Sequence, residues 1–536
     1  MDAARRLPAL GLGSALVALT ALVGVPLAAL ALTALELGRG ALDGGAMLIG
    51  AIWNTVWTAS LATLLSVTAG TALALLTERS SAPARGARRL AMVVALVVPG
   101  YIAALAWLRA YAPGGLLDSL LGISAGALVG PAGIVAVLAV EAAPICYFVV
   151  AAGLASRAEP DAERAARVSG GGPLTALRTV TLPLLRPSLL AAAAICFVLN
   201  ATAFGTPAVL GIPAGFATMT TQIYRDLAFS SDPASFGRAI GLALVLALLA
   251  AALLAAAEWL LRDRSARGGA PTGPTGAPRR RPTRAARVAS ATAWLLVLPA
   301  VGVPLLALLL TALTRATGLP PTPANLTLDN FSQVLDRHAL AAFGNSLVLS
   351  VAAAIGVLLL SGLALAARRI SSAAVGISFA LPGSTLAVAM LLAYGPFLRD
   401  TLAIILLCYV AKFWLLGWRP LAAAFDGIGA DVARAARVSG ATALTAARTI
   451  TLPLLRPAVV AAALIVFLFG MHEVTMSSLL YGPGTQTLAV AVLNLQQAGD
   501  PTLTAALAVV VSAVAIVVGL PLFARLRGGA GIGWRQ

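Results

Sequence analysis

Few side chains in this chain have the type and spacing that catalysis or ATP binding requires. The single lysine, Lys412, stands in an apolar run and follows Ala411, so a Gly-x-x-x-x-Gly-Lys phosphate-binding loop is impossible. The two histidines, His338 and His472, lie in different regions and predict no multi-histidine metal cluster. No nucleophile stands in a visible arrangement with a base. We therefore predict no catalytic residue, no metal site and no cofactor bound by this chain.

Two charged residues inside apolar runs are the strongest pointers to a polar path, because a charge at mid-bilayer is costly and is kept for a reason. They are Glu141 and Lys412. A segment of the chain occurs twice, and position 164 in the first copy corresponds to position 434 in the second. The same spacing places Glu141 opposite position 411, next to Lys412. We hypothesise that the two charges pair or line a central cavity. The alternative is that each lies near a helix end and snorkels to water.

One polar segment occurs twice in the chain. Residues 164–187 and 434–457 are identical at 19 of 24 positions and align at a constant spacing with no insertion. Arg, Ala and Leu favour helix, and Gly170 and Gly440 can adopt a left-handed turn. The Leu-Pro and Arg-Pro pairs that follow are expected to restart the chain in a new direction. Each copy is therefore predicted to form a short helix, a turn and the entry to a second helix.

The small and charged residues of each copy favour a helix that docks on a partner. The alanine pairs 165–166 and 435–436 are small enough to let another backbone or a large side chain come close. The arginines around them offer charged contacts to an acidic or carbonyl-lined rim. The alternative is a pair of amphipathic surface helices left by an accidental duplication.

This pattern resembles the signature loop of permease subunits of bacterial ATP-binding-cassette (ABC) importers: Glu-Ala-Ala, three residues, Gly, nine residues, Ile-x-Leu-Pro. Both copies carry Arg where the family usually has Glu. Glu163 lies one position early in the first copy, and the second copy has no acid nearer than Asp431. The resemblance implies cytoplasmic coupling helices, seated in grooves of the ATPase subunits, within loops 157–187 and 425–457. The residues that it assigns to ATPase coupling are Arg164, Ala165, Ala166, Gly170, Leu182, Pro183, Arg434, Ala435, Ala436, Gly440, Leu452 and Pro453.

Composition places these segments in a membrane protein. Hydrophobic residues make up 60% of the chain and charged residues 11%, whereas a soluble domain is about a quarter charged. The net charge of +17 does not indicate nucleic-acid binding, because the arginines do not cluster on a soluble domain. The apolar run after Arg6 is too long for a cleavable signal peptide, so we expect an uncleaved first span.

The apolar runs predict an all-α polytopic membrane protein with about 12 transmembrane helices, arranged as two parallel six-helix repeats. The predicted domains are a first half at 1–262, a linker at 263–287 that is rich in Arg, Gly and Pro, and a second half at 288–536. The predicted spans are 8–33, 50–76, 89–111, 125–151, 188–211 and 238–261, then 289–314, 344–367, 372–395, 401–423, 458–480 and 504–525. Asn54 and Asn345, which open the second and eighth spans, are expected to be helix-start residues.

The arginines predict the orientation of this bundle. Of the 36 arginines, 29 lie on one side of the predicted topology. They are in the two termini, the segment 79–89, both repeated loops, the linker with the adjacent Arg262, Arg368-Arg369 and Arg419. The positive-inside rule therefore places the repeated loops and both termini in the cytoplasm. The resemblance implies that the chain is a multi-pass protein of the bacterial inner (plasma) membrane.

Over nearly its whole length the chain resembles a fused permease of a binding-protein-dependent importer, of the type I architecture. Its sequence at 204–211 and 471–475 looks most like that of the ferric-iron importer group. The resemblance implies alternating access driven by two copies of a separate ABC ATPase subunit, which bind the ATP. It also implies an external binding protein that delivers cargo, contact with membrane lipid and no nucleic acid. The residues assigned to the translocation path are Glu141, Asn200, Thr202, Lys412, His472 and Glu473.

Three other interpretations stay open. Fused permeases of similar layout carry thiamine, phosphonates or other small solutes. A six-plus-six secondary transporter would show a Gly-x-x-x-Asp-Arg-x-Gly-Arg-Arg-like loop between spans two and three, but residues 78–89 have the wrong spacing. A receptor or scaffold would show no ATP-dependent uptake. A buried Asn or His on the fifth or eleventh span could also do no more than cap a neighbouring backbone group.

Overall fold

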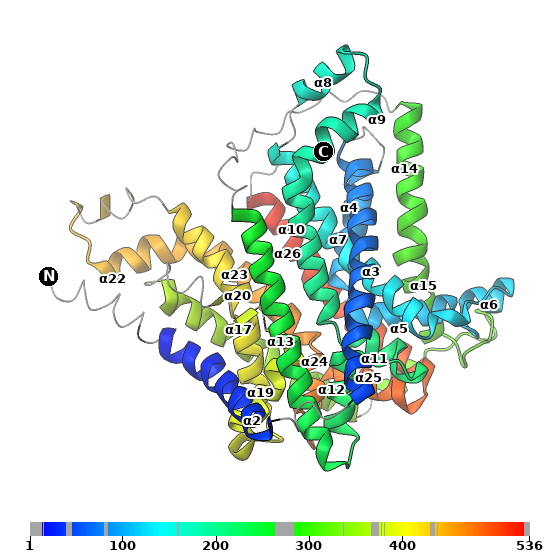
Figure 1. Ribbon diagram of the computed structural model, residues 1–536, viewed down its shortest axis with the longest axis vertical. Coiled ribbons are helices and arrows are strands. Elements are labelled where there is room, and N and C mark those ends of the chain that lie inside the picture. Colours follow the sequence, from blue (N-terminus) through cyan, green and yellow to red (C-terminus); the bar gives the residue numbers. More distant parts are fainter. Residues whose placement is uncertain are drawn as a thin grey trace.

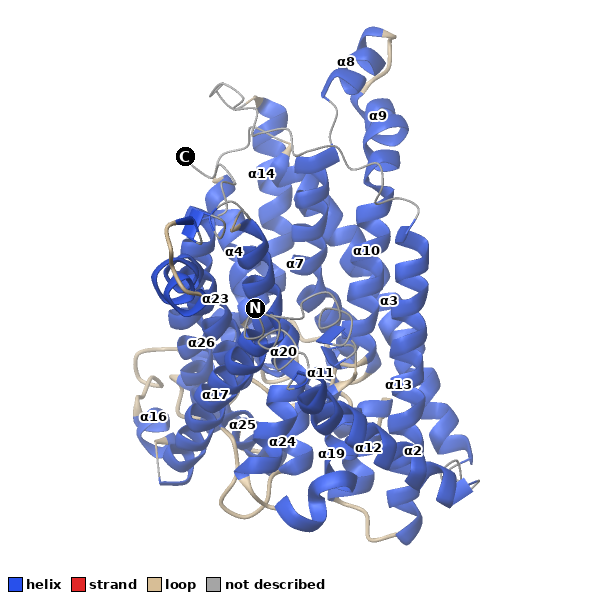
Figure 2. Ribbon diagram, turned by 90° about the vertical axis from the view of Figure 1, so that its left-hand side faces the viewer, coloured by secondary structure: helices blue, strands red, loops and turns tan. Residues whose placement is uncertain are grey.

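The computed structural model shows an elongated bundle of helices (Figures 1 and 2). Among the described residues the only other regular feature is an isolated bridge between Thr314 and Leu326. The prediction of an all-α polytopic protein is confirmed. The structure describes residues 13, 15–38, 45–79, 84–157, 160–262, 283–335, 337–365, 375–376, 378–379, 381–428, 432, 435–436 and 438–529.

The helices divide into two successive series. Those of the first half are η1 (Thr20–Gly24), α2 (Val25–Leu37), α3 (Gly45–Glu78), α4 (Arg85–Val97), α5 (Gly100–Tyr111), α6 (Leu116–Leu121), η3 (Gly126–Leu128), α7 (Pro131–Arg157), α8 (Pro160–Val168), α9 (Pro173–Ala176), η4 (Leu177–Thr181), α10 (Leu182–Ala201), α11 (Gly205–Leu210), η5 (Ile212–Ala214), α12 (Met219–Ala228) and α13 (Pro233–Arg262). Those of the second half are α14 (Arg284–Val297), η7 (Leu298–Gly302), α15 (Val303–Ala312), α16 (Asp329–Val334), α17 (Arg337–Ala364), α19 (Gly383–Leu398), α20 (Leu402–Gly427), α22 (Ala443–Ala446), η9 (Ala447–Thr451), α23 (Leu452–Met471), α24 (Thr475–Leu480), α25 (Leu488–Ala498) and α26 (Pro501–Gly529).

Ten helical stretches among the described residues are long and apolar enough to cross a membrane. The third predicted span, 89–111, is instead two helices that meet at a bend of 108°. The bend falls at Pro99, an extended residue without an N–H that is followed by Gly100. In the second half, Pro382 and Gly383 stand in the same way before α19, which has 16 residues. A Pro-Gly pair therefore interrupts each half at a corresponding place.

The fifth and eleventh predicted spans begin earlier and end earlier than expected. The helical stretches run through Leu174–Ala201 and Ala447–Met471, and each is followed by a break and a short helix, α11 or α24. The chain also does not restart at the Leu-Pro pairs. Pro183 and Pro453 lie in continuous helix after the π-helical turns η4 and η9, whose wider winding accommodates a proline that has no N–H.

The prediction that Asn54 and Asn345 are helix-start residues is wrong. Both lie inside a long helix, α3 or α17, and hold a loop against it. The Asn54 amide donates to the carbonyl of Ala217 at 2.9 Å. The Asn345 amide donates to the carbonyls of Gly484 and Gln486, both at 2.9 Å. These equivalent contacts show that the duplication extends well beyond the repeated polar segment.

The two halves exchange their first helices. The η1–α2 stretch of the first half packs on α19 and α20, whereas α14, η7 and α15 of the second half pack on α3, α4 and α5 (Figure 1). In both stretches a π-turn precedes a proline, Pro26 or Pro304, and leaves a carbonyl without a helical donor. The Tyr394 hydroxyl donates to Ala21 at 2.6 Å, and the Tyr111 hydroxyl donates to Pro299 at 2.5 Å. Each half thus supplies a hydrogen-bond donor to a helix carbonyl of the other half.

Removing either tyrosine hydroxyl is expected to weaken the contact between the halves. Tyr111→Phe and Tyr394→Phe should each lower the free energy of unfolding by about 1 kcal/mol, because a carbonyl loses the hydroxyl that donates to it. The two sites lie on opposite sides of the bundle, so the double variant should show about the sum. Thermal unfolding of the detergent-solubilised chain measures the effect. Unchanged melting of all three variants would show that these hydroxyls do not hold the halves together.

Candidate functional site

The first repeated segment forms a helix, a glycine turn and a second helix. Helix α8 is rich in Ala and Arg and starts at Pro160, the position where a missing N–H costs nothing. Gly170 ends it with a φ of 83°, and the N–H of Gly171 donates to Ala166 at 3.0 Å. This is the left-handed C-terminal cap that glycine favours. The predicted short helix and turn are confirmed here, but the second helix begins at Pro173 and not at the Leu-Pro pair.

The second segment repeats this turn in the part that the structure describes. Gly440 has a φ of 76°, and the N–H of Ala441 donates to Ala436 at 3.0 Å. The Ser439 hydroxyl donates to Ala435 at 3.0 Å. In Figure 1, α8 and α9 lie at the top and α22 at the left, both away from α12, α24 and α25 at the bottom. The two turns are therefore one design used twice.

The residues predicted for ATPase coupling lie on both sides of these turns in the sequence. Ala165, Ala435, Gly170, Gly440 and Leu452 are exposed, Ala166, Leu182, Pro183 and Pro453 are half-buried, and Ala436 is buried. Arg164 belongs to α8, and Arg434 lies outside the described residues. The arrangement thus presents small residues to the surface at both turns.

Sequence reasoning missed the most exposed apolar side chains of the two segments. Val168 and Val438 are each 88% exposed, immediately before the turn. A valine among arginines in a polar segment was the available signal. Both valines precede the apolar stretches Leu174–Ala201 and Ala447–Met471, so neither lies within a candidate span.

Glu141 lies against the break in the first half. Its carboxylate accepts a hydrogen bond from the Thr206 hydroxyl, which also donates to the carbonyl of Gly100 at 3.2 Å. A Cβ placed on Gly100 would stand 2.5 Å from Glu141 Oε2, so only glycine allows this approach. The carboxylate therefore faces the first turn of α5, where a helix favours negative charge.

Lys412 lies against the break in the second half. Its Nζ donates to the carbonyl of Phe379 at 2.9 Å and to the carbonyl of Leu381, both just before Pro382. The structure gives Glu141 and Lys412 separate partners, and no ion pair joins them among the described residues. The hypothesis of a direct pair is therefore wrong. Both charges instead lie at the Pro-Gly breaks, each within its own half.

The other path candidates lie where the fifth and eleventh stretches end. The Asn200 amide donates to the Thr63 hydroxyl at 3.1 Å, and the Thr202 hydroxyl donates to Val198 at 2.8 Å. His472 caps the end of α23, and its buried Nε2 has no hydrogen-bond partner among the described residues. Glu473 accepts from the N–H groups of Met476 and Ser477 at 2.8 and 3.0 Å. These four residues thus mark the second set of breaks in the bundle.

Two buried tyrosines that sequence reasoning missed stand in the same region. The Tyr409 hydroxyl shares a hydrogen bond with Ser477 Oγ at 2.6 Å and donates to the carbonyl of Glu473 at 3.5 Å. Tyr101, in the second position of α5, has a buried hydroxyl to which the described part of the chain offers no hydrogen-bond partner. Both read as ordinary apolar-run residues in the sequence, and only the fold brings them to the breaks.

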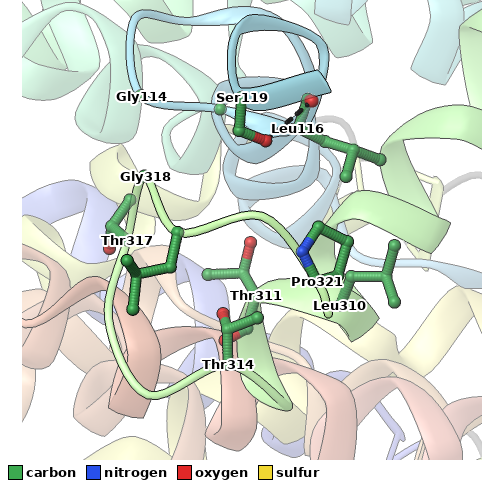
Figure 3. Close-up of a pocket in the computed structure, with 11 residues that line it drawn as sticks. Gly114, Leu116, Ser119, Leu310, Thr311, Thr314, Thr317, Gly318 and Pro321 are labelled. Carbon is green, nitrogen blue, oxygen red and sulfur yellow. Dashed lines mark hydrogen bonds between the residues drawn. The ribbon is translucent and has the colours of Figure 1, made fainter. Parts of the chain in front are cut away.

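A small pocket lies between the halves near the loop before α6 (Figure 3). Glycines, hydroxyl side chains and a few apolar residues line it, and it holds no charged residue. The lining residues are Gly114, Gly115, Leu116, Ser119, Leu310, Thr311, Thr314, Thr317, Gly318, Leu319 and Pro321. The pocket therefore joins the ends of α5 and α15, away from the charged breaks.

The fold and these segments define the class of the chain as an all-α polytopic membrane protein built from two related halves that carry duplicated surface turns. Residues 8–265 match the protein family described as "Binding-protein-dependent transport system inner membrane component". The second half repeats the polar segment of the first at 434–457. The first half of the chain is therefore similar to the inner membrane component of binding-protein-dependent transport systems, which is a transport subunit and not an enzyme.

Curated relatives carry compatible names. A protein of Sinorhizobium fredii named as a probable ABC transporter permease, y4fN, is 27% identical over 84% of this chain and 82% of its own length. A protein of Salmonella paratyphi A named as a 2-aminoethylphosphonate transport system permease, PhnV, is 28% identical over 37% of this chain and 80% of its own length. A protein of the same name from Salmonella typhi is 28% identical over 41% of this chain and 87% of its own length.

Proposed function

We propose that this chain is a membrane permease of an ATP-driven importer and carries both transmembrane halves, fused in one chain. The observation that carries the proposal is the duplicated turn: Gly170 and Gly440 end two equivalent helices, each with an 88% exposed valine two positions before the glycine. Two copies of one ATPase subunit would each find the same surface, one on each half. The ATPases bind and hydrolyse the ATP, since this chain contains no phosphate-binding loop.

The proposed orientation of the chain in the membrane rests on its charges. The arginine distribution supports a cytoplasmic position for the coupling segments and both termini, in a bacterial inner membrane. The opposite end, which carries α12, α16 and α25, then faces the external binding protein (Figure 2). The loops there hold the pocket of Figure 3, at a junction of the two halves.

Alternating access would use the breaks in the bundle. The Pro-Gly breaks at Pro99 and Pro382, and the gaps after Ala201 and Met471, divide the bundle into rigid helices that can move as bodies. Glu141, Asn200, Thr202, Lys412, His472 and Glu473 all lie at these breaks and form the proposed translocation path. Polar backbone at this depth is tolerated where it lines a cavity or is buried in protein.

For the cargo we propose ferric iron, which rests on the resemblance at 204–211 and 471–475 to the ferric-iron importer group. The second candidate is 2-aminoethylphosphonate, favoured by the printed name of the Salmonella relatives. Deleting the gene in its own host separates them. Loss of uptake of radiolabelled ferric iron with normal uptake of 2-aminoethylphosphonate supports iron, and the reverse result assigns the phosphonate.

The test of the permease function is co-purification with the ATPases of the chain's own membrane. Gly170→Val combined with Gly440→Val should reduce the recovered ATPase at least tenfold, because a left-handed residue costs about 1–2 kcal/mol without glycine at each of two sites. The β-branched side chain of valine raises that cost. The backbone at each turn must therefore leave the left-handed region, which changes the direction of the chain after it. The recovered ATPase is measured per mole of permease.

A control glycine stands in the same loop. Gly172 has open space around it and no left-handed φ, so Gly172→Val should leave the recovered ATPase near the wild-type amount. Absence of any ATPase with the wild-type chain would contradict the importer and favour a secondary transporter. Equal recovery with wild type and the double variant would show that the ATPases bind elsewhere.

A further inference from the structure

Three side chains fasten the first coupling segment to the end of α3. Arg79, which directly follows α3, forms an ion pair with Glu163 of α8. The Thr181 hydroxyl in η4 donates to Glu163 at 2.6 Å, and Arg79 donates to that hydroxyl at 2.7 Å. The Glu163 side chain is only 14% exposed, so water screens the pair weakly. The contact therefore joins three elements rather than two.

The end of α3 is itself held in place. Glu78 accepts from Arg89 Nε at 2.8 Å and from the Tyr147 hydroxyl at 2.5 Å, and it forms an ion pair with Arg85. These partners come from α4 and α7. A carboxylate with several charged and neutral donors is held more firmly than in a single surface pair. The segment around α8 is thus fixed to a rigid part of the first half.

The same network reaches the second half. Arg88 of α4 is buried, and its Nη1 donates to the Ser290 hydroxyl of α14 at 2.6 Å. Helix α14 belongs to the stretch that the second half lends to the first. A displacement of α8 would therefore act on both halves through the ends of α3 and α4.

The second half cannot build this network with the same residues. In the alignment that pairs Gly170 with Gly440, Glu163 corresponds to Ala433 and Tyr147 to Gly417. Thr181 corresponds to Thr451. Ala433 lies outside the described residues, but an alanine has no carboxylate. The threonine is kept without the acid that it contacts in the first half.

We propose that Glu163 is a positioning residue that makes the two coupling segments unequal. The first segment moves as one body with the end of α3 because Glu163 binds Arg79 and Thr181. The second has alanine at the matching position 433 and cannot form this contact, so we expect it to turn more freely on its helix. The proposal rests on the proposed function only in calling these segments coupling helices. The attachment itself is a property of the chain and is tested without the ATPase.

Matched spin-label pairs on the full-length chain in nanodiscs test the attachment. One pair joins Leu64→Cys on α3 to Val168→Cys, and the other joins Ile355→Cys on α17 to Val438→Cys. All four wild-type side chains are between 54% and 88% exposed, and the three native cysteines are buried. Double electron–electron resonance should give a distance distribution about twofold narrower for the first pair, since an ordered ion-pair network limits local opening.

Three substitutions then separate positioning from mere stability. Glu163→Gln should broaden the first distribution to the width of the second and leave the second unchanged. Exchanging the charges with Arg79→Glu and Glu163→Arg should narrow the first distribution again. Thr181→Val should broaden the first pair, whereas the matched Thr451→Val should leave the second pair as it was.

Two results would overturn the proposal. One is an unchanged first distribution in Glu163→Gln and Thr181→Val, and the other is equal broadening by Thr181→Val and Thr451→Val. Failure of the wild-type chain to recover ATPase is a different result. It would remove the coupling role of both segments and leave the measured inequality standing.

Discussion

Replacing Val168 and Val438 together by aspartate is expected to abolish recovery of ATPase subunits with the chain and to leave its thermal unfolding unchanged. Both side chains are 88% exposed, so neither contributes to the fold. If each is buried on docking, its loss removes about 1.5–3 kcal/mol of hydrophobic stabilisation per site. Burying a carboxylate in its place adds a desolvation penalty. The two sites together should weaken binding more than about a hundredfold.

The measurement is the dissociation constant of the purified ATPase for the permease in nanodiscs, with each single variant and the double variant. Leu328→Asp serves as the control, because Leu328 is 71% exposed and lies just before α16 at the other end of the bundle. The control should bind the ATPase as the wild type does. Normal binding by the double variant would place the docking surface outside the two turns.

Composition and spacing predicted the class of the protein and the position of its two glycine turns. Apolar runs separated by arginine-rich loops are a long-range average, so single residues hardly affect them. The repeated segment was visible because its glycine turn needs a fixed residue at a fixed place, and Gly170 and Gly440 do adopt the left-handed φ. A glycine turn is a local feature, and local features can be predicted from residues that are neighbours in the sequence.

Prolines show where this reading fails. Pro99 and Pro382 are extended residues that precede the first turn of a helix, yet Pro183 and Pro453 lie within continuous helix after a π-turn. All of them lack an N–H, so the difference comes from what can approach the chain. Gly100 after Pro99 admits the Glu141 carboxylate, a contact between residues far apart in the sequence. Hydropathy counts apolar letters and contains no such information.

The candidate site was predicted in the same uneven way. The equivalence of Glu141 with position 411 was real, but it indicated a shared place in two halves and not a shared contact. Glu163 looked like a displaced signature residue, whereas its role depends on Arg79, which lies far earlier in the chain. Tyr101 and Tyr409 could not be told from other apolar-run residues. Contacts between distant segments decide these roles, and one sequence does not show them.

Substituting Gly70 is expected to destabilise the chain more than any other single change of glycine to alanine on α3. A Cβ there would stand 2.6 Å from the carbonyl oxygen of Ala143 and 2.7 Å from the Cβ of Cys146. Backbone of α7 cannot rotate away as a flexible side chain would, so the two helices must separate. Small residues allow close helix packing in membranes, where apolar lipid gives no hydrophobic drive to association. Gly70→Ala should therefore cost about 1–3 kcal/mol, and Gly70→Val more.

Gly50 supplies the internal control for this series. It lies on the same helix with no atom within 4 Å of an added Cβ, so Gly50→Ala should be neutral or stabilise by up to about 1 kcal/mol through helix propensity. Thermal unfolding in one detergent compares the two. Because Tyr147 also contacts the Gly70 position and its hydroxyl donates to Glu78, separating α3 from α7 should loosen the first coupling segment as well. Equal melting of Gly70→Ala and Gly50→Ala would show that α3 and α7 are not packed this closely, and the rigid attachment of that segment would lose its basis.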